Sequence, residues 1–170
     1  MQFNRYLLAS AAFAGCLWST SALAEDASPD AKDSGNEIVV TAQFREQSLQ
    51  DTPLAITAVN AQTLEARGQT NVQQIGNQAP NVTLKPAAAS WGPSLTATIR
   101  GVGQYNYHPA LEPGVGVFID DVYYATLTGS MFDLLDVDRV EILRGPQGTL
   151  TGRNSIGGAI RVISKTPTGD

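Results

Sequence analysis

The sequence has few of the residues on which most catalytic and metal sites depend. It contains one histidine, His108, and one cysteine, Cys16, among 170 residues. A zinc site built from several such ligands is therefore excluded, and a Ser-His-Asp triad would have to use this single histidine. Sixteen acidic residues against eleven basic ones give a net charge of −5, which disfavours a nucleic-acid partner. We predict that the protein is not an enzyme and has no cofactor.

Calcium and nucleotide sites are disfavoured by spacing. The acidic pairs at residues 120–121 and 136–138 do not follow the EF-hand pattern. The glycines between residues 145 and 158 are not followed by Gly-Lys-Ser/Thr and do not form a GxGxxG register. These glycines therefore indicate tight turns rather than a phosphate cradle.

The first 24 residues have the pattern of a secretory signal peptide. Arg5 precedes an apolar run over residues 6–17, and residues 22–24 read Ala-Leu-Ala, a cleavage site with small residues. The run is shorter than the ~20 residues that a membrane-spanning helix needs. Cleavage after Ala24 would remove Cys16 from the mature chain. The alternative is a lipid anchor on Cys16, because residues 13–16 resemble a lipobox.

A short β-branched run follows a polar leader. Residues 25–36 lack large apolar side chains and are expected to be disordered, and residues 43–52 are a polar linker. The run between them favours an extended backbone. Spacing alone leaves two interpretations open: the first strand of the domain, or a strand kept unpaired so that it can join another protein's sheet. The run consists of Glu37, Ile38, Val39, Val40, Thr41 and Ala42.

Two short helices are predicted near the start of the compact region, which we place at residues 53–167. Asn60 is expected to cap a helix that continues to residue 66 and ends at Gly68. A second helix is expected after Thr70 and Gln73, which have capping-box spacing, and before Pro80.

Short strands dominate the remainder. In the strand that contains Val140 and Ile142, these two residues point one way, and Arg139 and Glu141 point the other, as in a half-buried strand. Residues 145–152 are predicted to form a tight turn with one helical turn inside. The sequence thus predicts a small α+β domain with a mixed sheet of short strands and a few short helices. The strands are expected at residues 55–59, 82–84, 96–99, 115–119, 138–143 and 159–163.

The order of four motifs resembles the N-terminal part of TonB-dependent outer-membrane receptors. Residues 37–42 resemble a TonB box, and residues 98–103 resemble the central motif of the plug domain. Residues 114–123 are similar to the strand and turn that follow it. Residues 138–148, with 157–160, are similar to the motif that ends the plug. Thr151 departs from the pattern, because relatives usually carry an aromatic residue there.

The resemblance implies a plug (cork) folded inside a 22-stranded outer-membrane barrel. Its TonB box would reach into the periplasm, where TonB and its inner-membrane motor drive uptake of a bulky nutrient such as a ferric siderophore. Twenty-two spanning strands need at least ~200 residues, and only residues 168–170 follow the plug. We therefore expect no β-barrel in this chain, which would be a truncated or separately supplied plug. The alternative is a free-standing periplasmic module that binds TonB or a ligand without transport.

The resemblance also suggests contact residues. Arg100 and Arg144 would meet carboxylates of the missing barrel, the alternative being ordinary surface arginines. Loops over residues 88–94 and 104–112 would face outward, toward a nutrient whose identity the sequence does not reveal. Their candidate ligand-facing side chains are Trp91, Tyr105, Tyr107 and His108.

Overall fold

The structure is a computed structural model that describes residues 37–87, 92–106, 108 and 110–169. The predicted signal peptide and leader lie outside the described residues, as do Trp91 and Tyr107. Among the residues described, no helix has both the length and the apolar character needed to cross a membrane.

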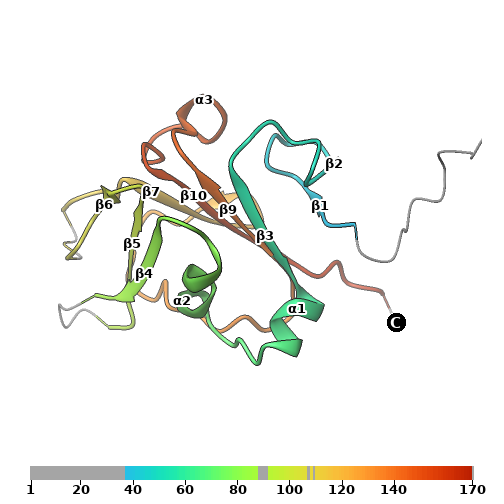
Figure 1. Cartoon of the computed structure of the whole chain (residues 1–170). Coiled ribbons are helices and arrows are strands. Elements are labelled where there is room, and N and C mark those ends of the chain that lie inside the picture. The colour runs from blue at the N-terminus through green and yellow to red at the C-terminus, as the bar shows by residue number, and fades with distance from the viewer. Residues whose placement is uncertain (1–36, 88–91, 107, 109, 170) are drawn as a thin grey trace, which may run out of the picture. The chain divides into compact units, whose positions relative to one another are not determined.

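A five-stranded mixed sheet organises the domain (Figure 1). Neighbouring strands run antiparallel, except that β7 (Val115–Ile119) and β10 (Gly158–Ser164) are parallel. β10, the last strand in the described part of the chain, lies in the middle of the sheet. In spatial order the strands are β3 (Ile56–Asn60), β9 (Val137–Arg144), β10 (Gly158–Ser164), β7 (Val115–Ile119) and β8 (Val122–Tyr123).

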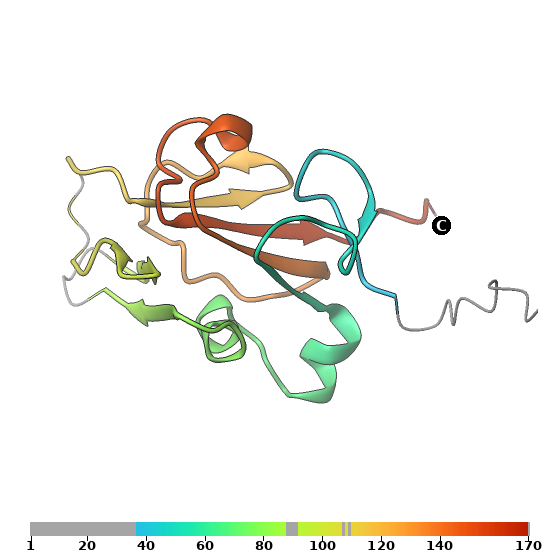
Figure 2. The same cartoon turned by 45° about the horizontal axis from the view of Figure 1, so that its top comes forward.

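Two smaller antiparallel sheets complete the strand arrangement (Figure 2). The first is three-stranded and the second is two-stranded. The small α+β fold with mixed sheets of short strands, predicted from the sequence, is confirmed. The strands are β4 (Val82–Pro86), β5 (Leu95–Ile99) and β6 (Val102–Gly103) in one sheet, and β1 (Val39–Val40) and β2 (Gln47–Ser48) in the other.

The first helix, α1 (Ala61–Ala66), begins and ends as the sequence predicts. The Asn60 side chain accepts a hydrogen bond from the Thr63 amide at 2.9 Å, which satisfies one of the donors at the helix start. Gly68 adopts a positive φ of 61° just after the helix. Asparagine capping and the glycine stop are therefore confirmed.

The second helix, α2 (Val72–Ile75), starts one residue later than predicted. Its capping box is formed by Asn71 and Gln74, not by Thr70 and Gln73. Asn71 has the extended backbone of a cap, and its side chain accepts from the Gln74 amide at 3.2 Å. Asparagine and threonine both suit the N-cap position, so the sequence is compatible with two helix starts that are one residue apart. The chain continues as the 3-10 helix η1 (Gly76–Gln78).

The main core lies on one face of the five-stranded sheet. The helices α1 and α2 and strands β4 and β5 contribute side chains to it, and Val140 and Ile142 point into it as predicted. Burial of this apolar surface provides the main stabilisation of the fold. Its buried members include Val59, Leu64, Val72, Ile75, Leu84, Leu95, Ile99, Ile160 and Val162.

The opposite face of strand β9 is also covered, so the prediction of a half-buried strand is wrong. Glu141 is fully buried, and the Arg139 side chain is only 14% exposed. The N-terminal segment 37–48 provides this cover: Ala42 packs in one cluster with Phe118 and Leu143, and Thr41 bonds to Glu141. Alternating polarity predicted the side-chain directions correctly, but it carried no information about this second layer.

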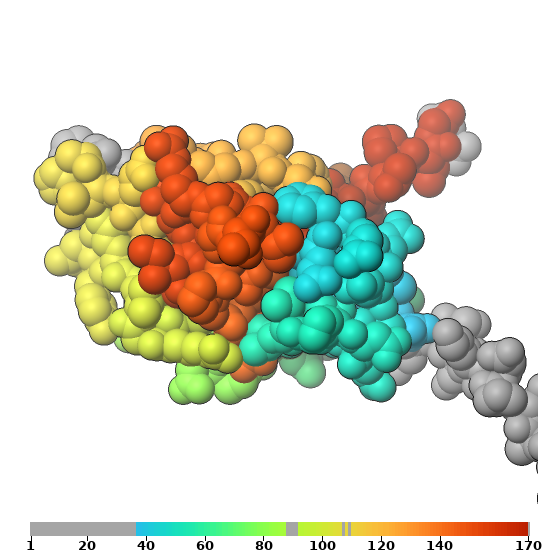
Figure 3. Space-filling model, turned by 90° about the horizontal axis from the view of Figure 1, so that it is seen from above, coloured from blue at the N-terminus to red at the C-terminus, as the bar shows by residue number. Residues whose placement is uncertain are grey.

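The glycine-rich stretch after β9 contains the short helix α3 (Gly148–Thr151), which confirms the predicted single helical turn. Figure 3 shows the orange atoms of this stretch between the cyan N-terminal segment and the yellow part of the chain. Asp120 and Asp121 form the predicted turn between β7 and β8, and both have positive φ, as in a type I′ hairpin. The Asp120 carboxylate accepts from the amide and hydroxyl of Ser164 at 2.8 and 2.9 Å, which fixes the turn to the end of β10.

Candidate functional site

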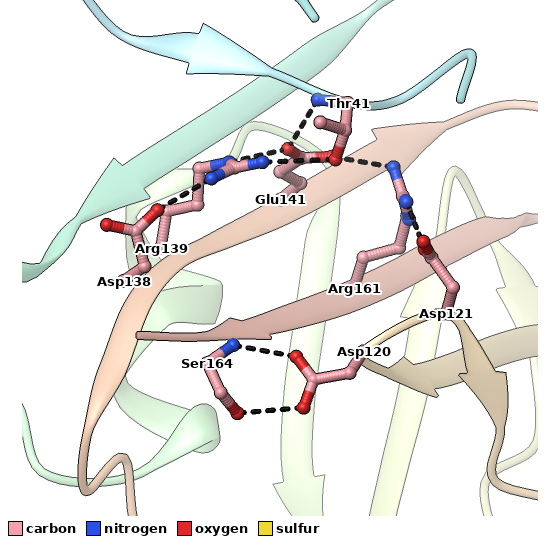
Figure 4. A network of polar contacts seen from close by, with 8 residues as sticks. All are labelled: Thr41, Asp120, Asp121, Asp138, Arg139, Glu141, Arg161 and Ser164. Carbon is pink, nitrogen blue, oxygen red and sulfur yellow. Dashed lines mark hydrogen bonds and ion pairs between the residues drawn. The ribbon is translucent and has the colours of Figure 1, made fainter. Parts of the chain in front are cut away.

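A buried carboxylate joins the N-terminal segment to the five-stranded sheet (Figure 4). Glu141 Oε1 accepts hydrogen bonds from the Thr41 amide and from Arg139 Nε, both at 2.9 Å. Glu141 Oε2 accepts from Arg161 Nη1 at 3.0 Å. Glu141 and Arg161 are direct cross-strand partners in the β9–β10 ladder, which brings their side chains together on one face.

Each arginine of this network also contacts a second carboxylate. Arg139 pairs with Asp138 at 2.6 Å, and Arg161 pairs with Asp121. Two guanidinium groups thus face three carboxylates, including Glu141, so the buried charges are compensated. Burial lowers the pKa of Arg139, but its bonds to Glu141 and Asp138 outweigh this and leave the pKa raised. Arg139 therefore stays cationic.

The N-terminal segment makes two further contacts with these arginines. Arg139 Nη2 donates to Thr41 Oγ1 at 3.0 Å. The Arg161 guanidinium lies 5.6 Å from the centre of the Phe44 ring, within the range of a cation–π contact. Three kinds of interaction therefore hold residues 41–44 against the sheet.

Strand β1 is paired within the domain, which contradicts one of the two interpretations that the spacing left open, a strand kept unpaired. Val39 lies opposite Ser48 and Val40 lies opposite Gln47. Residues 47–48 lie in the predicted linker, where polar side chains gave no strand signal, but a turn closed by the Phe44 amide and the Thr41 carbonyl brings them back to β1. β1 and β2 form their own sheet, separate from the five-stranded one.

The six residues predicted to bind TonB differ in exposure. Val40 is fully buried, and Ala42 is nearly so, whereas Val39 is 42% exposed. Glu37 is exposed, and Ile38 and Thr41 are half-buried. One side of the segment therefore packs on the domain, and the other side is open to solvent.

The ladder between β1 and β2 determines which backbone groups face outward. The Leu49 amide donates to the Ile38 carbonyl at 2.9 Å, one step beyond the pair of Val39 and Ser48. Val39 is therefore at a non-hydrogen-bonded position of the antiparallel ladder, and its amide and carbonyl point away from β2. The Thr41 amide points the same way, and it is the group that Glu141 binds.

Arg100 and Arg144, predicted to contact a barrel, lie close together. Arg100 is exposed after β5, and a Cβ atom added to Gly145 would lie 3.1 Å from its Nη1 atom. Arg144 Nη1 reaches the Pro80 carbonyl at only 3.5 Å, and its buried Nε has no hydrogen-bond partner. Within the described ranges, neither arginine forms an ion pair.

The described ligand-facing candidates lie in the loop after β6. Tyr105 is 78% exposed, and His108 is exposed and accepts from the Ala110 amide at 3.2 Å. Figures 1 and 2 both place the chain after β6 and the β1–β2 sheet at opposite ends of the described domain. The part of the chain that the structure describes contains no group of three or more His, Cys, Asp or Glu residues able to hold a metal ion.

Comparison with protein families identifies the domain. A family model described as the TonB-dependent receptor plug domain matches residues 48–159, more than half of the sequence. The chain belongs to this family. It is a transporter family without enzymatic activity, which agrees with the prediction that the protein is not an enzyme.

Curated relatives of the plug-domain chain are outer-membrane receptors. The iron-regulated outer membrane virulence protein of Vibrio cholerae is 28% identical over 96% of this chain and 24% of its own length. The hemin receptor of Yersinia enterocolitica is 30% identical over 85% of this chain and 21% of its own length. The chain therefore spans about a quarter or less of these relatives.

Solved structures show the same fold. The ferric yersiniabactin uptake receptor of Yersinia pestis matches 67% of this chain and 17% of its own chain, with a TM-score of 0.57 and 31% identity. The ferripyoverdine receptor of Pseudomonas aeruginosa matches 81% of this chain and 18% of its own chain, with a TM-score of 0.61 and 23% identity. The second likeness supports the fold alone.

The sequence alone does not predict the Glu141 network. The alternating pattern predicts an exposed face for Arg139 and Glu141, and it assigns no role to Arg161. A usable signal was present, because charged residues alternate in β9 and an arginine lies in the middle of the apolar strand β10. A charged side chain inside an apolar strand requires a partner if it is buried.

Proposed function

We propose that this chain is the plug of a TonB-dependent outer-membrane transporter that takes up a bulky nutrient such as a ferric siderophore. In this proposal residues 1–24 direct export and are removed, and residues 37–42 bind TonB in the periplasm. The family membership and the iron-related names of the relatives support it. The assignment of TonB binding to residues 37–42 rests on the position of the N-terminal segment on the domain.

The geometry of β1 suits strand addition. An extended segment with outward-facing backbone groups can add to the edge of a partner's sheet through main-chain hydrogen bonds. β1 is already extended, Val39 is exposed, and its amide and carbonyl face away from β2. Little conformational change is needed at Val39 for a strand to pair there.

Arg100 and Arg144 are proposed to meet carboxylates of a surrounding barrel. The Arg100 guanidinium lies beside Gly145, the residue that follows Arg144, and neither arginine forms an ion pair in the described domain. The partnerless Nε of Arg144 requires an acceptor. Carboxylates on an enclosing wall would provide it. This assigns the surface around Gly145 to the plug–barrel contact.

Nutrient contacts are proposed for the end of the domain opposite β1. Tyr105 and His108 are exposed in the loop after β6, whereas the other two candidates, Trp91 and Tyr107, lie outside the described residues. Aromatic side chains provide large contact areas with polar tips, as a bulky ligand with mixed polarity requires. Nutrient and TonB would then act at opposite ends of one domain.

Binding of the full chain to the C-terminal domain of TonB tests the proposal. Val39→Pro removes an outward-facing amide donor and is expected to weaken binding at least tenfold. Val39→Thr is the matched control, because it keeps both the β-branched shape and the amide, and it is expected to bind like the parent. Equal affinities of the parent and Val39→Pro, measured by isothermal titration calorimetry, would refute the assignment of residues 37–42.

A further inference from the structure

The outward edge of β1 is occupied at one position and open at the next. The Val39 amide and carbonyl point away from β2, and neither has a hydrogen-bond partner among the described residues. At Thr41, two residues on, the outward amide is bound to Glu141 and the carbonyl accepts from the Phe44 amide. A partner strand that pairs at Val39 must therefore displace the Glu141 bond before it can extend to Thr41.

We propose that the Glu141 carboxylate is a latch that competes with the partner strand for the Thr41 amide. This inference rests on the proposed binding of TonB to residues 37–42. Arg139 is the second part of the latch, because it donates to the Thr41 hydroxyl while it holds Glu141 Oε1. The latch keeps the C-terminal half of the segment on the domain, and its opening makes the full edge available.

The network is built so that the latch opens without leaving an unpaired buried charge. When Thr41 departs, Glu141 keeps its bonds to Arg139 and Arg161, and each arginine keeps its second carboxylate. Release therefore costs the contacts to Thr41 but not the desolvation penalty of an isolated ion.

The latched amide is not protected by burial alone. A groove of about 480 Å³ runs beside the latch, and Thr41 and Arg139 are both part of its lining. Thr41 is only half-buried beside this groove. Protection of the Thr41 amide from hydrogen exchange therefore depends on its bond to Glu141.

The first test changes Thr41 in the full chain. Thr41→Val removes the hydroxyl that Arg139 binds and keeps the backbone amide and the β-branched shape. We expect Thr41-position amide exchange and affinity for the TonB C-terminal domain each to rise about tenfold, because a hydrogen bond to a charged group is lost. Thr41→Ser is the matched control and is expected to match the parent in both measurements.

The second test changes the latch outside the TonB-binding segment. Glu141→Gln keeps the shape and one acceptor but removes the charge, so exchange and affinity are expected to rise about fivefold. Circular dichroism establishes whether this variant folds; if it does not, the Thr41→Val and Thr41→Ser pair decides alone. Higher affinity without faster exchange means direct contact of residue 41 with TonB, and it overturns the latch.

The two proposals fail separately. If Val39→Pro abolishes TonB binding but the variants at residues 41 and 141 change neither exchange nor affinity, the latch is refuted and the binding segment stands. If Val39→Pro binds normally, the binding segment itself is refuted, whatever the exchange rates show. Exchange at the residue-41 amide, followed by NMR, needs no TonB and reports on the latch independently.

Discussion

The burial of the Glu141 carboxylate leads to a prediction about the free energy of unfolding. In Glu141→Gln, the amide oxygen can still accept from the Thr41 amide and Arg139, but the amide nitrogen then faces Arg161 Nη1, so one charge-assisted bond is lost. Such a bond stabilises by about 1.5–3 kcal/mol. Breaking a buried ion pair completely costs about 3–5 kcal/mol. Because Arg161 keeps Asp121, we expect the free energy of unfolding to fall by about 3 kcal/mol.

Urea unfolding of the full chain, followed by circular dichroism, measures this loss. A decrease of this size corresponds to a drop in the melting temperature of about 10 °C for a domain of this length. Asp138→Asn is the matched control: its side chain is 51% exposed, so its loss is expected to cost less than about 1 kcal/mol. A Glu141→Gln variant whose unfolding midpoint equals that of the parent would refute the view that Glu141 stabilises the second layer.

Three further predictions concern single positions. Gly158→Ala is expected to destabilise by more than about 2 kcal/mol in urea unfolding, because φ is +148° and the added Cβ would lie 2.2 Å from a backbone oxygen of β9; Gly148→Ala, where nothing lies within 4 Å, should be nearly neutral. Asn71→Ala should lower the free energy of unfolding by about 1 kcal/mol through loss of the α2 cap, and Thr70→Ala should lower it by less than half of that. A larger loss for Thr70→Ala than for Asn71→Ala would instead support the capping box of Thr70 and Gln73 that the sequence predicts. Arg144→Met should change the chain's own stability by less than about 0.5 kcal/mol, since the guanidinium lacks an ion pair in the described domain; a larger loss by thermal melting would argue against its assignment to a barrel.

The local elements of the fold were largely predictable because local chemistry determines them. Asn60 and Gly68 bound α1 through a side-chain cap and a left-handed stop, and both features depend on residue type. The Asp120–Asp121 turn follows from its two-residue length between β-branched strands. For α2 the predicted start is one residue too early, because Thr70 and Asn71 have similar capping ability and compete for the N-cap position.

What the sequence did not predict is long-range packing. The contact between Thr41 and Glu141 joins residues 100 positions apart, and no periodicity within either segment encodes it. The β1–β2 pairing was missed because Gln47 and Ser48 have little strand propensity and are paired through the preceding turn. The neighbouring positions of Arg100 and Arg144 likewise follow from tertiary structure, although the family motifs had marked both residues.

The central position of β10 affects how the chain acquires its fold. During synthesis, β7 and β9 leave the ribosome before the strand that lies between them, because β10 ends at Ser164. Until β10 is made, β7 and β9 both lack the neighbour that they share in the sheet. β7 and β10 are far apart in the sequence, and pairs between distant segments form slowly. The five-stranded sheet therefore cannot be completed until β10 has been made.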